Sequence, residues 1–321
     1  MQAALIGLGY WGKNYLRLLL DNKKVNLLMV GDVSNDALSR LEIPPGIIKT
    51  NVLEDIYNDT DIDFVIVTTP ASTHYSIVKG LLESGKSVLV EKPLTLSSDE
   101  AKELIEMAYK SHLTLLVGHT YLYNDAYQFL KKFIGEGNLG KILYVYGERM
   151  GLGPIRSDAS CIWDLAVHDI SMALDIMGRM PSKTSAISSV FINKDMGISD
   201  FASIGFSYDS GQTFSFNVSW YSPSKVRTWK IVGEKAMVIF DDMDKEFPIS
   251  IYEISANPNF VRDDVTGYYS LGKMFKPRIH NREPLKVLLD NFISLFQKSD
   301  SYRDELALNV VKLIENLEKG V

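Results

Sequence analysis

Cysteine is almost absent from this chain: only one of its 321 residues, Cys161, is a cysteine. A single cysteine excludes intrachain disulfides and metal sites built from several thiolates. We expect Cys161 to be a small buried apolar residue, with a reactive thiol as the alternative.

Long apolar runs and blocks of like charge are also missing. No run reaches the roughly 18 apolar residues that a membrane-spanning helix needs, and the first residues lack the basic segment of a secretory signal. The 34 basic and 40 acidic side chains are spread along the chain and leave a net charge of −6, which argues against nucleic acid as a partner. We therefore expect a cytoplasmic protein that binds neither membranes nor nucleic acid.

The first third of the chain alternates short apolar runs with helical patterns. A composition of 46% hydrophobic and 23% charged residues is typical of globular proteins, and 321 residues predict two domains. The expected strands are 3–6, 25–30, 64–69, 87–92 and 114–119, and the expected helices are 10–20, 71–84 and one that begins at 97 or 98. This alternation predicts an α/β domain over residues 1–119, a Rossmann-type doubly wound parallel sheet.

The pattern changes after residue 119. Helices are expected at 124–134, 163–177, 283–296 and 303–317, with a strand at 141–148 and mainly strands over 182–255. Thr213–Trp220 alternates apolar with small polar residues, and the turn Asp209-Ser210-Gly211 joins it to the preceding strand. Residues 120–321 should thus form an α+β domain on a large open antiparallel sheet, whose polar face meets water or another subunit.

A glycine-rich turn, Gly7-Leu8-Gly9-Tyr10-Trp11-Gly12, lies between the first strand and the first helix. Gly7 suits a tight turn, Gly9 lets backbone approach a pyrophosphate, and Gly12 allows close helix packing. Asp32 ends the next strand about 20 residues later, which is typical of a dinucleotide site. A carboxylate accepts hydrogen bonds from ribose hydroxyls and repels a 2′-phosphate, so NAD is favoured over NADP.

Two further segments end strands of the predicted parallel sheet. Thr68 to His74 follows one strand, and Glu91-Lys92-Pro93 follows the next. Ligands of such sheets bind outside the carboxyl ends of the strands, so both segments should line the cofactor. His74 has an alternative as a surface or capping residue. Lys92, followed by a proline that disfavours helix, could stabilise negative charge on a reacting oxygen.

Asp164 and His168 are four residues apart in a predicted helix and share one face. A carboxylate raises the basicity of a neighbouring imidazole, and such a base suits removal of a hydroxyl proton. A surface ion pair and a half-formed metal site are alternatives, but further metal ligands are missing nearby.

Four segments together carry a family resemblance: Gly7–Asn14 (GLGYWGKN), Thr69–His74 (TPASTH), Glu91–Pro93 (EKP) and Asp164–His168 (DLAVH). In this order they resemble the glucose-fructose oxidoreductase, inositol dehydrogenase and rhizopine-catabolism (Gfo/Idh/MocA) family, along essentially the whole chain. The resemblance implies two domains, an NAD(P) cofactor and hydride transfer at a sugar or cyclitol carbinol carbon. It also implies dimers or tetramers formed through the C-terminal sheets.

Carried over by position, the resemblance makes Lys92 the catalytic lysine, His168 the general acid/base and Asp164 its acidic partner. The expected cofactor-binding residues are Gly7, Gly9, Tyr10, Trp11, Gly12, Asp32, Thr69, Pro70, His74 and Glu91. The segment Gly118-His119-Thr120-Tyr121 departs from the Gln/Asn-x-Arg-Phe pattern of many relatives, which leaves its substrate contacts open.

The loop Gly151–Asp158 (GLGPIRSD) is similar to that of relatives acting on nucleotide-linked N-acetyl sugars at the C3 hydroxyl. Arg149 and Arg156 could bind a carboxylate or diphosphate, and Tyr121 is a further substrate candidate; solvated surface arginines are the alternative. A nucleotide-sugar 3-dehydrogenase or 3-ketoreductase is therefore expected, with an inositol or free-sugar dehydrogenase as the alternative enzyme. A regulator that senses NAD without chemistry is the alternative of another class.

Overall fold

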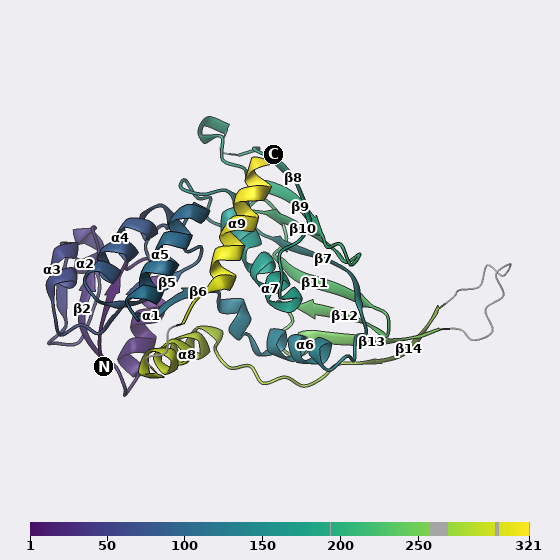
Figure 1. The fold of residues 1–321 in the computed structure, drawn as a ribbon, viewed down its shortest axis with the longest axis horizontal. Coiled ribbons are helices and arrows are strands. Elements are labelled where there is room, and N and C mark those ends of the chain that lie inside the picture. The colour runs from purple at the N-terminus through teal and green to yellow at the C-terminus, as the bar shows by residue number, and fades with distance from the viewer. Residues whose placement is uncertain (193, 257–268, 299–301, 321) are drawn as a thin grey trace. The chain divides into compact units, whose positions relative to one another are not determined.

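The computed structural model describes residues 1–192, 194–256, 269–298 and 302–320. The chain divides into two compact units, whose elements Figure 1 labels. The first comprises Met1–Thr120 and Pro284–Glu315, and the second comprises Tyr121–Glu283 and Asn316–Val321. Residues 284–315, expected in the second domain, thus group with the parallel sheet.

Six parallel strands form the sheet of the first unit. They are β1 (Gln2–Ile6), β2 (Asn26–Gly31), β3 (Ile48–Thr50), β4 (Phe64–Val67), β5 (Ser87–Glu91) and β6 (Leu115–Gly118). Their order is β3-β2-β1-β4-β5-β6, and every neighbouring pair is parallel. β4 and β5 are buried along their whole lengths, as strands covered on both faces must be. The predicted Rossmann-type sheet is confirmed.

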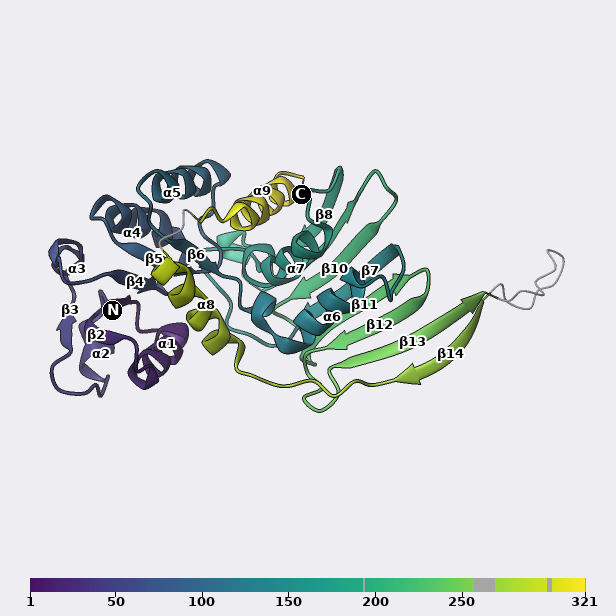
Figure 2. The same cartoon turned by 60° about the horizontal axis from the view of Figure 1, so that its bottom comes forward.

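Helices flank this sheet, with α4 and α5 on one side and α1 and α8 on the other (Figure 2). The helices of this unit are α1 (Tyr10–Asp21), α2 (Asn35–Ser39), α3 (Leu53–Asn58), α4 (Ala71–Glu83), α5 (Ser98–Lys110) and α8 (Pro284–Lys298). A further helix, α9 (Glu305–Lys319), begins in this unit and ends in the second. α8 joins the unit through its apolar stripe: the Phe292 ring lies 5.2 Å from that of Phe64 on β4. No helix in the described ranges is both long and apolar enough to cross a bilayer.

Eight strands form the sheet of the second unit. They are β7 (Ile142–Met150), β8 (Lys183–Ser189), β9 (Phe201–Ser207), β10 (Thr213–Ser219), β11 (Val226–Gly233), β12 (Ala236–Asp241), β13 (Ile249–Ala256) and β14 (Tyr269–Phe275). The order is β14-β13-β12-β11-β7-β10-β9-β8. β7 and β10 pair in parallel and the other neighbours are antiparallel, so the sheet is mixed.

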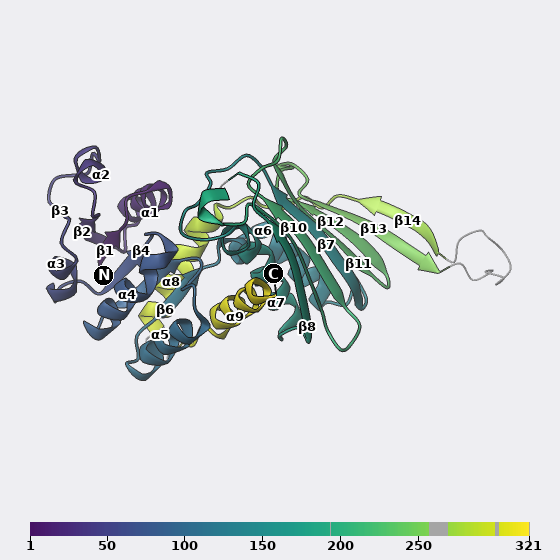
Figure 3. The same ribbon diagram turned by 90° about the horizontal axis from the view of Figure 1, so that it is seen from above.

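The two faces of this sheet differ. Helices α6 (Asp125–Gly135) and α7 (Val167–Met177) lie on one face, as Figures 1 and 3 show. The core on that face is aromatic, with Phe216 stacked 5.0 Å from Trp229. The opposite face carries the polar residues of β10 and exposed Tyr144, Tyr146 and Ile187. The alternation predicted for Thr213–Trp220 therefore separates the two faces.

Short helical turns complete the second unit. A 3-10 turn spans Thr120–Tyr123, another spans Lys194–Met196, and a π-helical turn spans Ile162–Ala166 just before α7. The continuous α-helix predicted over 163–177 is therefore wrong in its first turn. Cys161, which precedes the π turn, is fully buried, and burial raises the pKa of its thiol to about 12. This environment matches the expected apolar role and not a reactive one.

Candidate active site

The glycine-rich turn between β1 and α1 is shaped by close backbone contacts. Gly7 has φ +91°, and a Cβ atom there would lie 2.9 Å from the backbone of Thr68. A Cβ atom on Gly12 would lie 1.9 Å from the carbonyl oxygen of Gly7, so neither position can accept a side chain. Gly9, the N-cap of α1, has no atom within 4 Å of its Cβ position. The backbone is therefore accessible at the helix N-terminus, which fits a pyrophosphate.

Asp32 follows β2, and its carboxylate is held in place by backbone. Oδ2 accepts a hydrogen bond of 2.7 Å from the amide of Leu8, and Oδ1 accepts one of 2.8 Å from the amide of Ser34. The contact with Leu8 ties the carboxylate directly to the glycine-rich turn. These residues fit the pyrophosphate and ribose of a dinucleotide such as NAD. Beside the turn, the exposed ring of Tyr10 packs edge-on against Trp11 at 5.4 Å.

His74 on α4 connects the loops that follow β4 and β5. Its Nδ1 lies 2.8 Å from the carbonyl oxygen of Pro93, and its Nε2 lies 2.9 Å from that of Thr69. Carbonyl oxygens only accept, so both contacts are hydrogen bonds only when both ring nitrogens carry protons. The side chain is buried, which rules out the surface alternative. His74 therefore fixes the shape of the two loops expected at the cofactor.

Lys92 directly follows β5 and is joined to Pro93 by a cis peptide bond. The buried carboxylate of Glu91 holds this point of the backbone, because it accepts hydrogen bonds from the Tyr15 hydroxyl (3.1 Å) and the Lys92 amide (3.2 Å). Tyr15 belongs to α1, so Glu91 links the lysine to the helix of the glycine-rich turn.

The pKa of His119, just after β6, depends on burial and on the charge of Lys92. Burial and then the charge of Lys92 lower the pKa of His119 to about 4, so its ring is neutral at neutral pH. Neither ring nitrogen hydrogen-bonds to another side chain or backbone group among the described residues.

His168 lies in the first turn of α7, immediately after the π-helical turn that contains Asp164. π-Helical turns are frequent at functional sites. The Asp164 carboxylate accepts hydrogen bonds from Arg156 Nε (2.8 Å) and Trp220 Nε1 (3.0 Å). Arg156, expected at the substrate, thus pairs with the carboxylate expected to assist His168.

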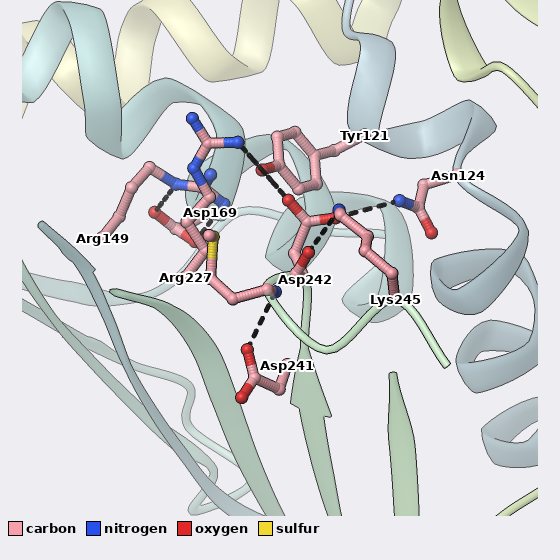
Figure 4. Close-up of polar contacts among 9 residues, drawn as sticks. Tyr121, Asn124, Arg149, Asp169, Arg227, Asp241, Asp242 and Lys245 are labelled. Carbon is pink, nitrogen blue, oxygen red and sulfur yellow. Dashed lines mark hydrogen bonds and ion pairs between the residues drawn. The ribbon is translucent and has the colours of Figure 1, made fainter. Parts of the chain in front are cut away.

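The Tyr121 ring contacts both the imidazole of His168, at 4.9 Å between centroids, and the guanidinium of Arg149, at 4.3 Å. Arg149 is buried and forms a bidentate ion pair with Asp169, with N–O distances of 2.9 and 3.0 Å (Figure 4). Burial lowers the pKa of Arg149, but the Asp169 carboxylate and Tyr121 more than offset this and raise it overall. The structure therefore gives Arg149 a buried ion pair in place of a surface that could meet a substrate phosphate.

Several residues around His168 were not predicted from the sequence. They are Asp169, Trp220, Arg227, Trp229 and Asp242. Only Asp169 had a local signal, because it follows His168 directly; the others approach through strand pairing between distant segments. Within the described ranges, no three His, Cys, Asp or Glu side chains converge as metal ligands would.

Comparison with known proteins agrees with this geometry. A model of the oxidoreductase family with an NAD-binding Rossmann fold matches residues 1–119, and a model of the GFO/IDH/MocA C-terminal domain matches residues 127–239. The scyllo-inositol 2-dehydrogenase (NAD(+)) of Bacillus subtilis strain 168 is 30% identical over 70% of this chain and 68% of that enzyme.

Two further proteins resemble the chain. The UDP-N-acetylglucosamine 3-dehydrogenase of Acidithiobacillus ferrooxidans is 34% identical, but the match covers only 40% of each chain. A crystal structure of a protein from Magnetospirillum magnetotacticum MS-1 superposes with a TM-score of 0.83 and 28% identity, over 99% of both chains. With two family models that follow one another along the chain and a relative similar over most of its length, this protein belongs to the Gfo/Idh/MocA oxidoreductase family.

Proposed function

We propose that this protein is an NAD-dependent dehydrogenase that oxidises a secondary hydroxyl of a sugar, or reduces the matching ketone. The observation that carries the proposal is the position of Lys92. It directly follows β5, at the carboxyl edge where sheets of this type bind their ligands, and Glu91 fixes its backbone. A sheet that served only to bind a dinucleotide would need no cation there.

In the proposed mechanism, the ammonium of Lys92 hydrogen-bonds the substrate oxygen and stabilises the negative charge that develops on it. The imidazole of His168 accepts the hydroxyl proton in oxidation and returns it in reduction. Asp164, on the π-helical turn before His168, is the acidic partner that the family resemblance implies for this imidazole. NAD, when bound, supplies the hydride acceptor.

The proposed cofactor contacts are those of the glycine-rich turn and the two strand-end loops. They are Gly7, Gly9, Tyr10, Trp11, Gly12, Asp32, Thr69, Pro70, His74 and Glu91. The preference for NAD over NADP rests on Asp32, whose carboxylate is already oriented by two backbone amides and would lie against a 2′-phosphate.

We propose a nucleotide-linked N-acetyl sugar, oxidised at C3, as the substrate. Similarity to the UDP-N-acetylglucosamine 3-dehydrogenase supports it, as does the exposed loop 151–158, where Arg156 is part-exposed. An inositol is the second candidate, because the scyllo-inositol 2-dehydrogenase matches a larger share of the chain.

The test is nicotinamide absorbance with NAD and a panel of UDP- and dTDP-sugars, inositols and free aldoses. We expect turnover with a UDP-N-acetyl sugar, and a loss of at least about a hundredfold in kcat for His168→Ala. Lys92→Ala should fall as steeply, while both variants keep their affinity for NADH in a fluorescence titration.

Two variants serve as matched controls. Lys79→Ala changes a lysine of α4 in the first unit that pairs with Glu103 of α5. His280→Ala changes an exposed histidine of the second unit. Both should turn over like the wild type. Equal rates with NAD and NADP would contradict the role of Asp32. NADH binding with no turnover across the whole panel would instead support a regulator that senses NAD.

A further inference from the structure

A closed cycle of contacts surrounds His168 within the second unit. The imidazole packs against the Tyr121 ring, the ring packs against the guanidinium of Arg149, and the guanidinium pairs with Asp169. Asp169 is the next residue after His168, so the cycle returns to the backbone that carries the imidazole. The four members come from three elements: Tyr121 from the turn before α6, Arg149 from strand β7, and His168 and Asp169 from helix α7.

Two further contacts hold the cycle from outside. The Tyr121 hydroxyl donates a hydrogen bond of 2.8 Å to Asp242, which Asn124 and Arg227 also contact (Figure 4). Trp229 Nε1 donates a bond of 2.7 Å to the Asp169 oxygen that also faces Arg149. The Tyr121 ring is thus held at its hydroxyl end and over its face, and a residue so constrained constrains its neighbour in turn.

The burial of these groups fits a positioning role. The side chains of Arg149 and Asp169 are 6% and 2% exposed, and Tyr121 and His168 are each only partly buried. The buried bidentate pair is a rigid support for the Tyr121 ring, because leaving either charge unpaired would cost folding free energy. His168 is more exposed than this pair, so its imidazole is the group that we propose meets the substrate.

We propose that Tyr121 is a positioning residue for the proton acceptor: its ring, backed by Arg149, sets the orientation of the His168 imidazole. This rests on the proposed function, in which His168 takes the hydroxyl proton. A base contributes only when its nitrogen lies within hydrogen-bonding reach of the proton it removes, and a displacement of about 1 Å can cost about a hundredfold in rate. The hydroxyl of Tyr121 serves to anchor the ring and takes no part in proton transfer.

The kinetic arm compares three variants, with UDP-N-acetylglucosamine and scyllo-inositol as probes and NAD as cofactor. Tyr121→Leu removes the ring and should lower kcat roughly tenfold to a hundredfold with unchanged KM for NAD. Tyr121→Phe keeps the ring and should stay within about threefold of wild type. Tyr109→Leu is the matched control, because this exposed tyrosine on α5 of the first unit also lies under a cation, Arg303.

The second arm needs no turnover. Labelling of histidine Cε1 gives one NMR signal for each of the five histidines. The signal that disappears in His168→Gln is that of His168. Tyr121→Leu should shift that signal by loss of the ring current, whereas Tyr121→Phe and Tyr109→Leu should leave it in place. An unmoved signal in Tyr121→Leu would overturn the proposal. A kcat equal to that of wild type, calculated from the concentration of folded protein that binds NADH, would overturn it as well. If no substrate of the full panel reacts, the proposed function fails, and the signal still decides whether the Tyr121 ring packs on the imidazole.

Discussion

Two buried titratable side chains of the first unit respond to pH in opposite directions. Burial and the charge of Lys92 lower the pKa of His119 from 6.5 to about 4. Asp304, just before α9, has its pKa raised from 3.8 to about 6 by burial, although it accepts hydrogen bonds from the amides of Val117 and Ala307. Between pH 4 and 6 the unfolded chain binds the proton at His119, whereas the folded chain binds the one at Asp304. The free energy of unfolding thus rises with pH through His119 and falls through Asp304.

We predict that, when either group is removed, the free energy of unfolding shows the pH dependence of the other group. Relative to wild type, His119→Phe should lose about 2 to 3 kcal/mol of unfolding free energy as the pH rises from 4 to 6, and Asp304→Asn should gain a similar amount. Urea unfolding at several pH values measures both. Parallel curves for wild type and either variant would contradict the assigned protonation states.

At the level of single residues, the sequence predicted best where one residue type is required by local backbone. Gly7 and Gly12 have no space for a Cβ atom, so the required backbone appears in the sequence as glycines at a fixed spacing. Arg149 shows the opposite case: its charge suggested a ligand, but its partner Asp169 comes from another element and could not be predicted from neighbouring residues.

Among the elements, β7 and α7 are joined by the buried pair Arg149–Asp169. Arg149→Met would leave the Asp169 carboxylate buried with Trp229 as a remaining donor, and we predict a loss of roughly 3 to 5 kcal/mol in unfolding free energy. The double variant Arg149→Met/Asp169→Leu removes both charges and leaves only the Trp229 donor unsatisfied, so its loss should be about 1 to 3 kcal/mol.

A double-mutant cycle in urea measures this coupling, with Asp169→Leu as the second single variant. If the double variant loses as much as the two single variants together, the pair does not act as a unit and the two elements are held by packing alone.

The predicted elements succeeded where apolar runs were long and uniform. The buried strands of the parallel sheet and the alternating β10 show their periods plainly. The short β3, α2 and α3 were missed, because three to six residues carry too little pattern. The π-helical turn was missed too, because its one extra residue per turn leaves the apolar pattern close to that of an α-helix.

For the whole molecule, the order of elements along the chain did not reveal which unit each belongs to. α8 follows the eight strands in sequence, yet its phenylalanines pack on β4 of the first unit. An amphipathic stripe shows that a helix is covered, but many apolar surfaces can cover it. The boundary between residues 119 and 120 therefore stays a prediction of where the cofactor-binding domain ends and the substrate-binding domain begins. Residues 284–315 contribute to the core of the first unit.

The open face of the eight-stranded sheet gives the last prediction, which concerns assembly. Tyr144, Tyr146 and Ile187 expose large apolar area there, among the small polar residues of β9 and β10. We expect a homodimer or homotetramer that buries this face, because an open sheet face with exposed large apolar side chains is suited to association.

The double variant Tyr144→Asp/Ile187→Asp places two like charges on this face and should reduce the mass in solution, measured by light scattering, to that of one chain. Leu20→Asp, at a similarly exposed position on α1, is the matched control and should keep the wild-type mass. A wild-type protein that is already a monomer at micromolar concentration, or a double variant that keeps its assembly, would show that this face meets water. In the first case its tyrosines would serve only the cross-strand packing of the sheet.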